Sequence, residues 1–227
     1  MILIVGGEPE TSSVELITDD DFKRIDLPKL PKEIVGPSLI KHNNVILSCG
    51  GEKSGANKEC FQLTLDGWCH HSYLNAERLL STFVSTSTGS YLFGSFFENG
   101  RNTYEFLEKD SSVWQPYNMP FDFKGGCAVA ISDTEIWLMG GTLERTIFSF
   151  NTITREFTNN KNIKLSHVRE GPACAIIPGT KQILVTGKLF SKVKISLVIS
   201  TTFEFSCQKV DNKFLENGVF FSIPNLK

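Results

Sequence analysis

Short apolar runs that end in glycine recur five times along this chain at a nearly constant spacing. The first glycines of the runs are Gly6, Gly50, Gly94, Gly140 and Gly187, so successive runs are separated by 44 to 47 residues. A period of this length, built from short strands, is typical of radial or solenoid repeats and not of an ordinary layered domain. The spacing therefore predicts a series of similar β units along the whole chain.

Each unit contains four segments with the character of β-strands, most clearly in the fourth unit. These segments cover residues 125–131, 136–139, 146–150 and 155–158. Runs rich in Ile, Val, Phe and Thr, separated by Gly, Asn, Asp and Ser, indicate an antiparallel meander. Helical periodicity of useful length is absent, because the best candidate, residues 75–80, covers less than two turns. The sequence thus predicts an all-β fold.

The strand before each glycine is apolar on both faces, so we expect it to be buried on both sides. The following strands alternate between apolar and polar residues, as outer strands do. An aromatic residue recurs in the outermost strand of each unit, where it can fill the wedge between neighbouring sheets. These aromatic residues are Phe22, Trp68, Trp114, Phe157, and Phe203 or Phe205.

An apolar strand, a Gly-Gly pair and a Trp or Phe in a later strand, at about 45 residues per unit, resemble the kelch repeat. The resemblance covers essentially the whole chain and is weaker where Ser95 and Lys188 replace the second glycine. It implies that each repeat forms one four-stranded blade of a β-propeller. Six blades are commonest in the kelch family, whereas the five glycine signatures predict five blades in a single domain of residues 1–227.

The two ends of the chain together resemble one further unit. Residues 216–227 are similar to residues 170–181, which directly precede the strand at residues 183–187. We therefore expect residues 219–223 to pair beside residues 2–5 and to complete the N-terminal blade, as in the mixed closing blade of the kelch family. Such closure covers strand edges that would otherwise stay unpaired. The alternative is a fragment of a six-bladed kelch protein whose ends fall at a repeat boundary.

Charge and targeting signals argue against several classes of partner. The formal net charge is −2 and no basic run is interleaved with aromatic residues, which disfavours binding to nucleic acid or anionic membranes. The apolar start at residues 1–5 is too short for the core of a signal peptide. Residues 189–200 contain two lysines and are too short to cross a bilayer. These features predict a cytoplasmic protein.

The six cysteines are scattered, without a Cys-x-x-Cys pair. Cys127 and Cys174 each stand 13 residues before the glycine of their own unit, so they occupy equivalent core positions of two repeats. We expect reduced, buried thiols and no bridge between these two residues.

No set of residues in the sequence predicts catalysis, a metal site or a cofactor. His70 and His71 follow Cys69, but neighbouring residues of a strand point to opposite faces and cannot converge on one ion. The kelch family includes a copper-radical oxidase, iron-dependent specifier proteins and a sialic acid mutarotase. Neither the ligand sets of the first two nor a convergent acid/base pair can be assigned here. A small mutarotase-like enzyme nevertheless remains the alternative function.

Cations recur just before the innermost strand of three units. Arg78 and Lys124 precede their glycines by 16 residues, and Arg169 precedes its glycine by 18. In kelch domains that act as substrate receptors, arginines at this place line the central face and pair with acidic motifs. The resemblance therefore implies that Arg78 and Arg169, and less clearly Lys124, bind an acidic or phosphorylated protein segment. Solvated charges at the blade edges are the alternative. The predicted function is a non-catalytic protein–protein interaction module that serves as a substrate receptor or scaffold.

Overall fold

The computed structural model describes residues 2–6, 12–17, 23–52, 58–169, 171–177, 180, 182–187, 197–200 and 205–206. These residues form five antiparallel β-sheets, and the only helices among them are short 3-10 turns. Two compact units hold the sheets: one contains the described residues up to Asn118 and the other those from Met119 onward. In the described part of the chain, no helix is both long and apolar enough to span a membrane. The single domain over residues 1–227 stays a prediction.

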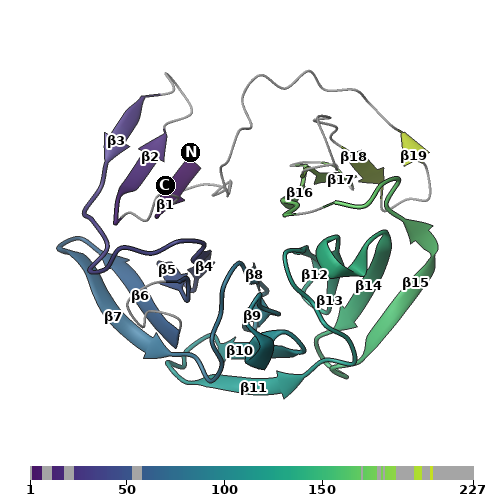
Figure 1. Cartoon of the computed structure of the whole chain (residues 1–227), viewed down its shortest axis with the longest axis horizontal. Helices are drawn as coiled ribbons and strands as arrows, with labels where there is room; N and C mark the ends of the chain where they lie inside the picture. Colours follow the sequence, from purple (N-terminus) through teal and green to yellow (C-terminus); the bar gives the residue numbers. More distant parts are fainter. Residues whose placement is uncertain are drawn as a thin grey trace. The chain divides into compact units, whose positions relative to one another are not determined.

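The first unit contains three sheets, in which the strand order follows the order along the chain (Figure 1). The first sheet consists of β1 (Ile2–Val5), β2 (Val14–Ile17) and β3 (Arg24–Asp26). The second sheet consists of β4 (Ser38–His42), β5 (Val45–Cys49), β6 (Glu59–Thr64) and β7 (Gly67–Tyr73). The third sheet consists of β8 (Thr82–Ser85), β9 (Gly89–Phe93), β10 (Thr103–Glu108) and β11 (Trp114–Asn118), with the 3-10 turn η2 (Glu98–Gly100) before β10.

The second unit contains two further four-stranded sheets. The first of these consists of β12 (Cys127–Ser132), β13 (Glu135–Met139), β14 (Thr146–Asn151) and β15 (Phe157–Lys164), with the 3-10 turn η3 (Gly141–Leu143) before β14. The second consists of β16 (Cys174–Ile176), β17 (Gln182–Val185), β18 (Leu197–Ser200) and β19 (Phe205–Ser206). The predicted meander of residues 125–158 is confirmed, although its last strand extends to Lys164.

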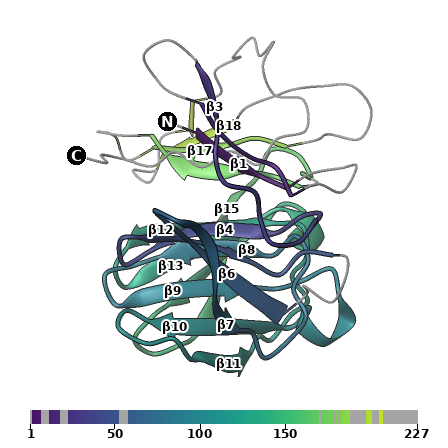
Figure 2. The same cartoon turned by 90° about the vertical axis from the view of Figure 1, so that its left-hand side faces the viewer.

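Three of the strands that end at the recurrent glycines are largely buried, as predicted. All of β9 is buried, as are Ile136–Met139 in β13 and the end of β5. Continuously apolar strands of this kind are typical of positions that exclude water on both faces. The first strands of the second and third sheets, β4 and β8, lie side by side (Figure 2), and the Ser38 hydroxyl donates a 2.7 Å hydrogen bond to the Ser81 carbonyl.

Two of the recurrent glycines are required by close backbone contacts. Gly50 has a φ of +68°, and a Cβ atom there would lie 2.4 Å from the Arg78 carbonyl oxygen. Gly6 has a φ of +65°, and its Cβ atom would lie 2.6 Å from the Ile34 carbonyl oxygen. Only glycine combines this backbone conformation with so close an approach. These contacts place the end of each strand against the connection that enters the next sheet.

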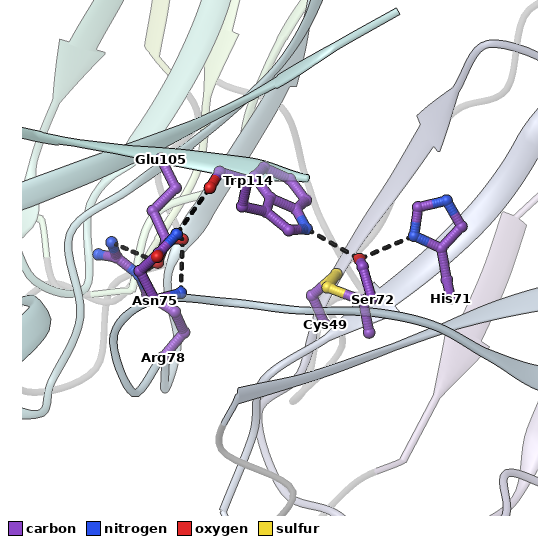
Figure 3. Close-up of a disulfide and its surroundings, with 8 residues drawn as sticks. Cys49, His71, Ser72, Asn75, Arg78, Glu105 and Trp114 are labelled. Atoms are coloured by element: carbon purple, nitrogen blue, oxygen red, sulfur yellow. Dashed lines mark hydrogen bonds and ion pairs between the residues drawn. A yellow bond between two sulfur atoms is a disulfide. The ribbon is translucent and has the colours of Figure 1, made fainter. Parts of the chain in front are cut away.

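Two of the predicted aromatic residues of the outer strands, Trp68 and Trp114, fill the space between sheets. Trp114 of β11 is buried in one apolar cluster with residues of the second and third sheets, among them Leu47 and Phe83. Its indole N–H donates to the Ser72 hydroxyl at 3.1 Å, beside the disulfide of Cys49 (Figure 3). Trp68 of β7 likewise packs on the cluster of the first and second sheets and donates to the Pro28 carbonyl at 2.9 Å. Phe22 and Phe203 lie outside the described residues.

Four cysteines form two disulfides, so the prediction of reduced thiols is wrong for them. Cys49 is bonded to Cys60, its partner across β5 and β6. Cys127 is bonded to Cys174, which joins β12 to β16 with a Cα–Cα distance of 5.9 Å. Cys127 and Cys174 do occupy equivalent positions, as predicted. These positions lie on the first strands of two adjacent sheets, close enough for a disulfide bond to form. The cytoplasmic location stays a prediction.

Peptide mapping should show the Cys127–Cys174 bond directly. Digestion without reductant should yield the peptides of these two cysteines joined, and a dithiol reductant should separate them because it exchanges with the bond. Cys69, which is exposed and free, serves as the control and should react with an alkylating reagent in the folded protein before reduction. Alkylation of Cys127 in the unfolded chain before any reductant is added would show that the pairing is incorrect.

The predicted closure falls on residues that the structure does not describe. Within the described part, β1 pairs with β2. Residues 219–223, its predicted second neighbour, lie outside the described residues. Closure of a ring and the number of blades therefore stay predictions.

Candidate functional site

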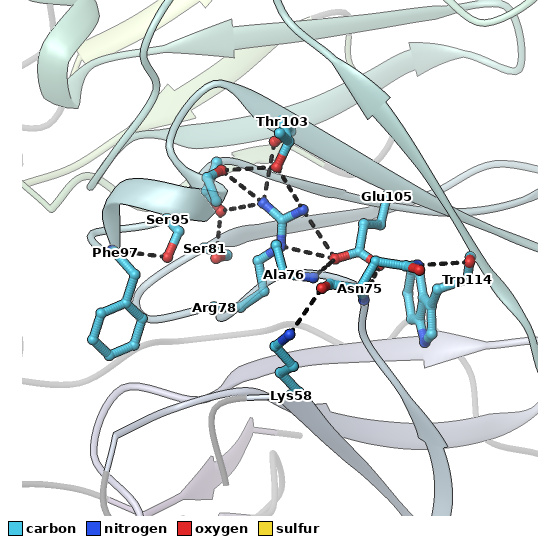
Figure 4. A network of polar contacts seen from close by, with 12 residues as sticks. Lys58, Asn75, Ala76, Arg78, Ser81, Ser95, Phe97, Thr103, Glu105 and Trp114 are labelled. Atoms are coloured by element: carbon cyan, nitrogen blue, oxygen red, sulfur yellow. Dashed lines mark hydrogen bonds and ion pairs between the residues drawn. The ribbon is translucent and has the colours of Figure 1, made fainter. Parts of the chain in front are cut away.

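Arg78 lies in the connection between β7 and β8, with a residue exposure of 1%. Its Nη2 atom lies 3.0 Å from Glu105 Oε1, and neither side chain is accessible to solvent. Nη1 donates to the carbonyl oxygens of Gly94, Gly100 and Thr103 at 3.0, 2.8 and 3.1 Å, and Nη2 donates to the Thr103 hydroxyl at 2.9 Å (Figure 4). Burial lowers the pKa of Arg78, and the charge of Glu105 opposes this shift. The guanidinium is thus an internal, fully bonded ion.

Glu105 of β10 also holds the backbone of the same connection. Its carboxylate accepts hydrogen bonds from the Asn75 N–H at 2.7 Å, the Asn75 side-chain amide at 2.8 Å and the Ala76 N–H at 3.1 Å. The Asn75 amide also donates to the Trp114 carbonyl at 2.8 Å. Because charged acceptors form the stronger hydrogen bonds, this carboxylate fixes the course of residues 75–78 against the third sheet.

Both interpretations of the three predicted cations, partner binding and solvated edge charges, require accessible side chains, but two of the three cations are buried. Arg169 has an exposure of 0%, and its Nη1 atom lies 3.4 Å from the carbonyl oxygen of Gly187, the counterpart of Gly94. Lys124 is half-buried, and its backbone N–H donates to the Thr142 hydroxyl at 3.1 Å. Side chains as buried as those of Arg78 and Arg169 cannot pair directly with a partner segment in this conformation.

Arg78 and Arg169 are buried because the position that they occupy in their connections is a core position. Four successive connections place a side chain with at most 1% exposure there: Ile34, Arg78, Phe123 and Arg169. In the second sheet, Phe61 takes the register position that Glu105 takes in the third, opposite the buried second strand. Ile34 and Phe61 belong to one apolar cluster. The position therefore holds either an apolar pair or an ion pair, and Lys124 falls one residue beyond it.

Four connections meet next to the Arg78–Glu105 pair: two join neighbouring sheets (β3–β4 and β7–β8) and two lie within a sheet (β5–β6 and β9–β10). We call their residues 35–36, 52, 77–80 and 95–98 the loop cluster. The Leu80 N–H donates to the Gly36 carbonyl at 3.1 Å, and the Phe96 N–H donates to the Leu79 carbonyl at 3.0 Å. The Ser95 hydroxyl accepts from the N–H groups of Leu79 and Phe97 at 3.1 and 3.0 Å. Because each connection is bonded to another, the loop cluster is a defined surface.

The loop cluster exposes apolar side chains. Leu80 and Phe96 have exposures of 42% and 41%, while Val35, Leu79 and Phe97 are half-buried. Figure 4 shows the ring of Phe97 pointing away from the guanidinium of Arg78. Leu80 has a φ of +49°, a left-handed conformation that is rare for leucine and is concentrated at functional sites. Sequence reasoning missed this surface. The available signal was two apolar pairs at the same end of the third sheet: Leu79-Leu80 just before β8 and Phe96-Phe97 just after β9.

The histidines of the first unit lie in structural positions. His42 is buried, and its Nδ1 atom lies 2.9 Å from the hydroxyl of Ser90, which is itself inaccessible to solvent. His70 packs against Tyr73 with ring centroids 4.4 Å apart and the rings tilted by 45°, and His71 Nδ1 lies 2.8 Å from the Ser72 hydroxyl. In the described part of the chain, no three His, Cys, Asp or Glu side chains are arranged to hold a metal ion.

His42 should make the protein less stable in acid. Burial and the nearby His71 lower its pKa from 6.5, and the Lys109 carbonyl and the Asp110 carboxylate oppose this shift. Below pH 6.5 the unfolded chain therefore binds a proton that folded His42 does not, so the free energy of unfolding falls as the pH falls through this window. The slope for one proton is at most about 1.4 kcal/mol per pH unit. Urea unfolding on both sides of this pH should show a smaller slope for His42→Gln, and an unchanged slope would contradict the assignment.

Comparison with known proteins supports the fold. No protein-family model matches the sequence, and no curated protein is detectably similar to it. The solved structure of YjhT is similar to this chain, with a TM-score of 0.66 and 12% sequence identity. The similarity covers 85% of this chain and 69% of the YjhT chain. At this identity the likeness concerns the all-β fold alone.

Proposed function

We propose that the chain is a kelch-type β-propeller that acts as a non-catalytic protein-interaction module and binds its partner through the loop cluster. The observation that carries this proposal is the exposure of Leu80 and Phe96 on connections that are bonded to one another. Exposed apolar side chains on a fixed backbone lose little conformational entropy on binding, which favours association with a protein surface. Binding and catalytic residues are commonly carried on loops that a rigid scaffold positions.

The propeller part of the proposal is supported by the repeat. Each of the five sheets contains one of the glycine-ended runs, in the strands β1, β5, β9, β13 and β17. Meanders that recur at this period are the units of propeller blades. We propose five blades, with residues 219–223 completing the blade of β1.

The proposal does not include the acidic segment expected from the sequence. That expectation depended mainly on Arg78 and Arg169, whose side chains are buried. Arg78 instead supports the loop cluster, since its guanidinium holds the carbonyls of Gly94 and Gly100 on either side of Ser95–Asn99. Its contribution to binding is therefore indirect.

Substitution of the exposed apolar residues should abolish partner binding without unfolding the chain. We expect Leu80→Asp and Phe96→Asp each to reduce the amount of partner that co-purifies from native lysate by at least about tenfold, as for central apolar contacts of interfaces. Aspartate accepts the left-handed backbone of position 80 more readily than leucine does, so the fold should be retained. The matched control is Val113→Asp, which changes an apolar residue with 67% exposure in the β10–β11 connection. Equal loss of the partner with all three variants would refute the proposed site.

A further inference from the structure

Three carboxylates belong to the same loop cluster as the exposed apolar side chains of Leu80 and Phe96. Glu52 is exposed and pairs with Val35 through backbone hydrogen bonds of 2.9 and 3.2 Å. Glu77 is half-buried and lies three residues before Leu80 in the chain. Its Oε2 atom accepts a hydrogen bond from the side-chain amide of Asn99 at 3.4 Å. Glu98 is exposed and begins η2, two residues after Phe96. The negative side chains thus come from three of the four connections of the loop cluster.

No cation of the loop cluster is available to balance these carboxylates. Within its residues, Arg78 is the only Lys or Arg, and it is buried against Glu105. Because the charges of Arg78 and Glu105 cancel inside the protein, the accessible surface of the cluster keeps the charge of Glu52, Glu77 and Glu98. A surface of this kind disfavours acidic and phosphorylated segments and favours cationic ones, since like charges brought together cost free energy on association.

We propose that the loop cluster binds a peptide segment in which an apolar side chain is flanked by Lys or Arg. This inference rests on the proposed function and names the chemistry of its partner. The apolar side chain packs on Leu80 and Phe96, and the flanking cations pair with the three carboxylates. Such pairs fix the register of the segment and speed its encounter with the protein, while the apolar contact supplies most of the affinity.

Synthetic peptides with one apolar centre and different flanks test this inference. The full chain is titrated into labelled peptides that share a Leu-Phe centre and carry flanks of Lys, Ser or Glu, and binding is followed by fluorescence anisotropy. We expect the Lys-flanked peptide to bind roughly tenfold more tightly than the Ser-flanked peptide. This difference should shrink as salt is added, because exposed charges are screened. The Glu-flanked peptide should bind most weakly.

A charge-neutral variant separates the two parts of the binding. Glu52→Gln, Glu77→Gln and Glu98→Gln together should remove the preference for Lys flanks and leave the binding of the Ser-flanked peptide unchanged. These side chains are not buried in the sheet cores, and a thermal melt of the variant checks that the fold is kept. A Glu-flanked peptide that binds as tightly as the Lys-flanked one, or a preference that survives in the variant, would overturn the inference. The same is true if no peptide binds. The proposed function fails separately, when Leu80→Asp and Phe96→Asp retain the co-purified partner.

Discussion

Replacement of Arg78 by Met should destabilise the protein by about 3–5 kcal/mol, the usual cost of removing one partner of a buried ion pair. The variant keeps a side chain of similar length but leaves the Glu105 carboxylate in a site without access to solvent. It also removes the donors to the carbonyls of Gly94, Gly100 and Thr103, and an unpaired buried acceptor costs free energy of its own. Urea unfolding followed by tryptophan fluorescence measures the change, since Trp114 packs between the second and third sheets.

Lys124→Met is the matched control for this variant. Lys124 is half-buried and lies one residue beyond the core position of its connection, so we expect its replacement to cost less than about 1 kcal/mol. A second comparison uses the apolar side-chain pair that replaces the ion pair in the second sheet. Arg78→Ile combined with Glu105→Phe copies the apolar pair Ile34 and Phe61 and should be more stable than Arg78→Met. If Arg78→Met and Lys124→Met unfold at the same urea concentration, the supporting role of Arg78 is refuted.

Deletion of residues 214–227 should lower the free energy of unfolding by several kcal/mol. We predict that residues 219–223 pair with β1, and removal of a strand at this position would expose the apolar side chains that it covers, together with an unpaired strand edge. The loss should be cooperative, because in a closed ring each blade packs on two neighbours. Thermal unfolding of the full and truncated chains measures this effect.

Proline substitutions distinguish pairing from a general effect of the deletion. Phe221→Pro removes a backbone donor within the predicted strand and should reproduce much of the loss, whereas Asn225→Pro lies beyond the strand and should not. A truncated chain that melts like the full chain would show that residues 219–223 do not complete the sheet of β1.

The strand pattern could be predicted because it depends on local sequence. The glycine-ended runs, the turn residues and the alternation within strands each act over a few residues, and together they located the strands of the fourth unit to within a few residues, except for the extension of β15. The Cys127–Cys174 bond could not be predicted in this way. It depends on the distance between β12 and β16, which is set by the packing of two sheets and not by the spacing of the two cysteines along the chain.

The candidate site was predicted only in part for a similar reason. Counting from the glycines found the connection that carries Arg78, but the orientation of the guanidinium is decided by Glu105, which lies 27 residues further along the chain. A carboxylate between the buried residues Tyr104 and Leu107 was the available signal that this cation has an internal partner. The loop cluster depends on hydrogen bonds between connections, such as that from Leu80 to Gly36, which leave no pattern in the sequence.

Photo-crosslinking from the loop cluster tests most directly whether this surface binds a protein. A photoreactive phenylalanine analogue is placed at position 96, and the same analogue at position 113 serves as an exposed control in the same unit. After irradiation in native lysate, we predict that position 96 yields a discrete adduct with the protein that co-purifies with the chain, and that the adduct disappears when Leu80→Asp is added. Position 113 should yield no such adduct. A co-purified partner that crosslinks to position 113 and not to position 96 would contradict binding through the loop cluster.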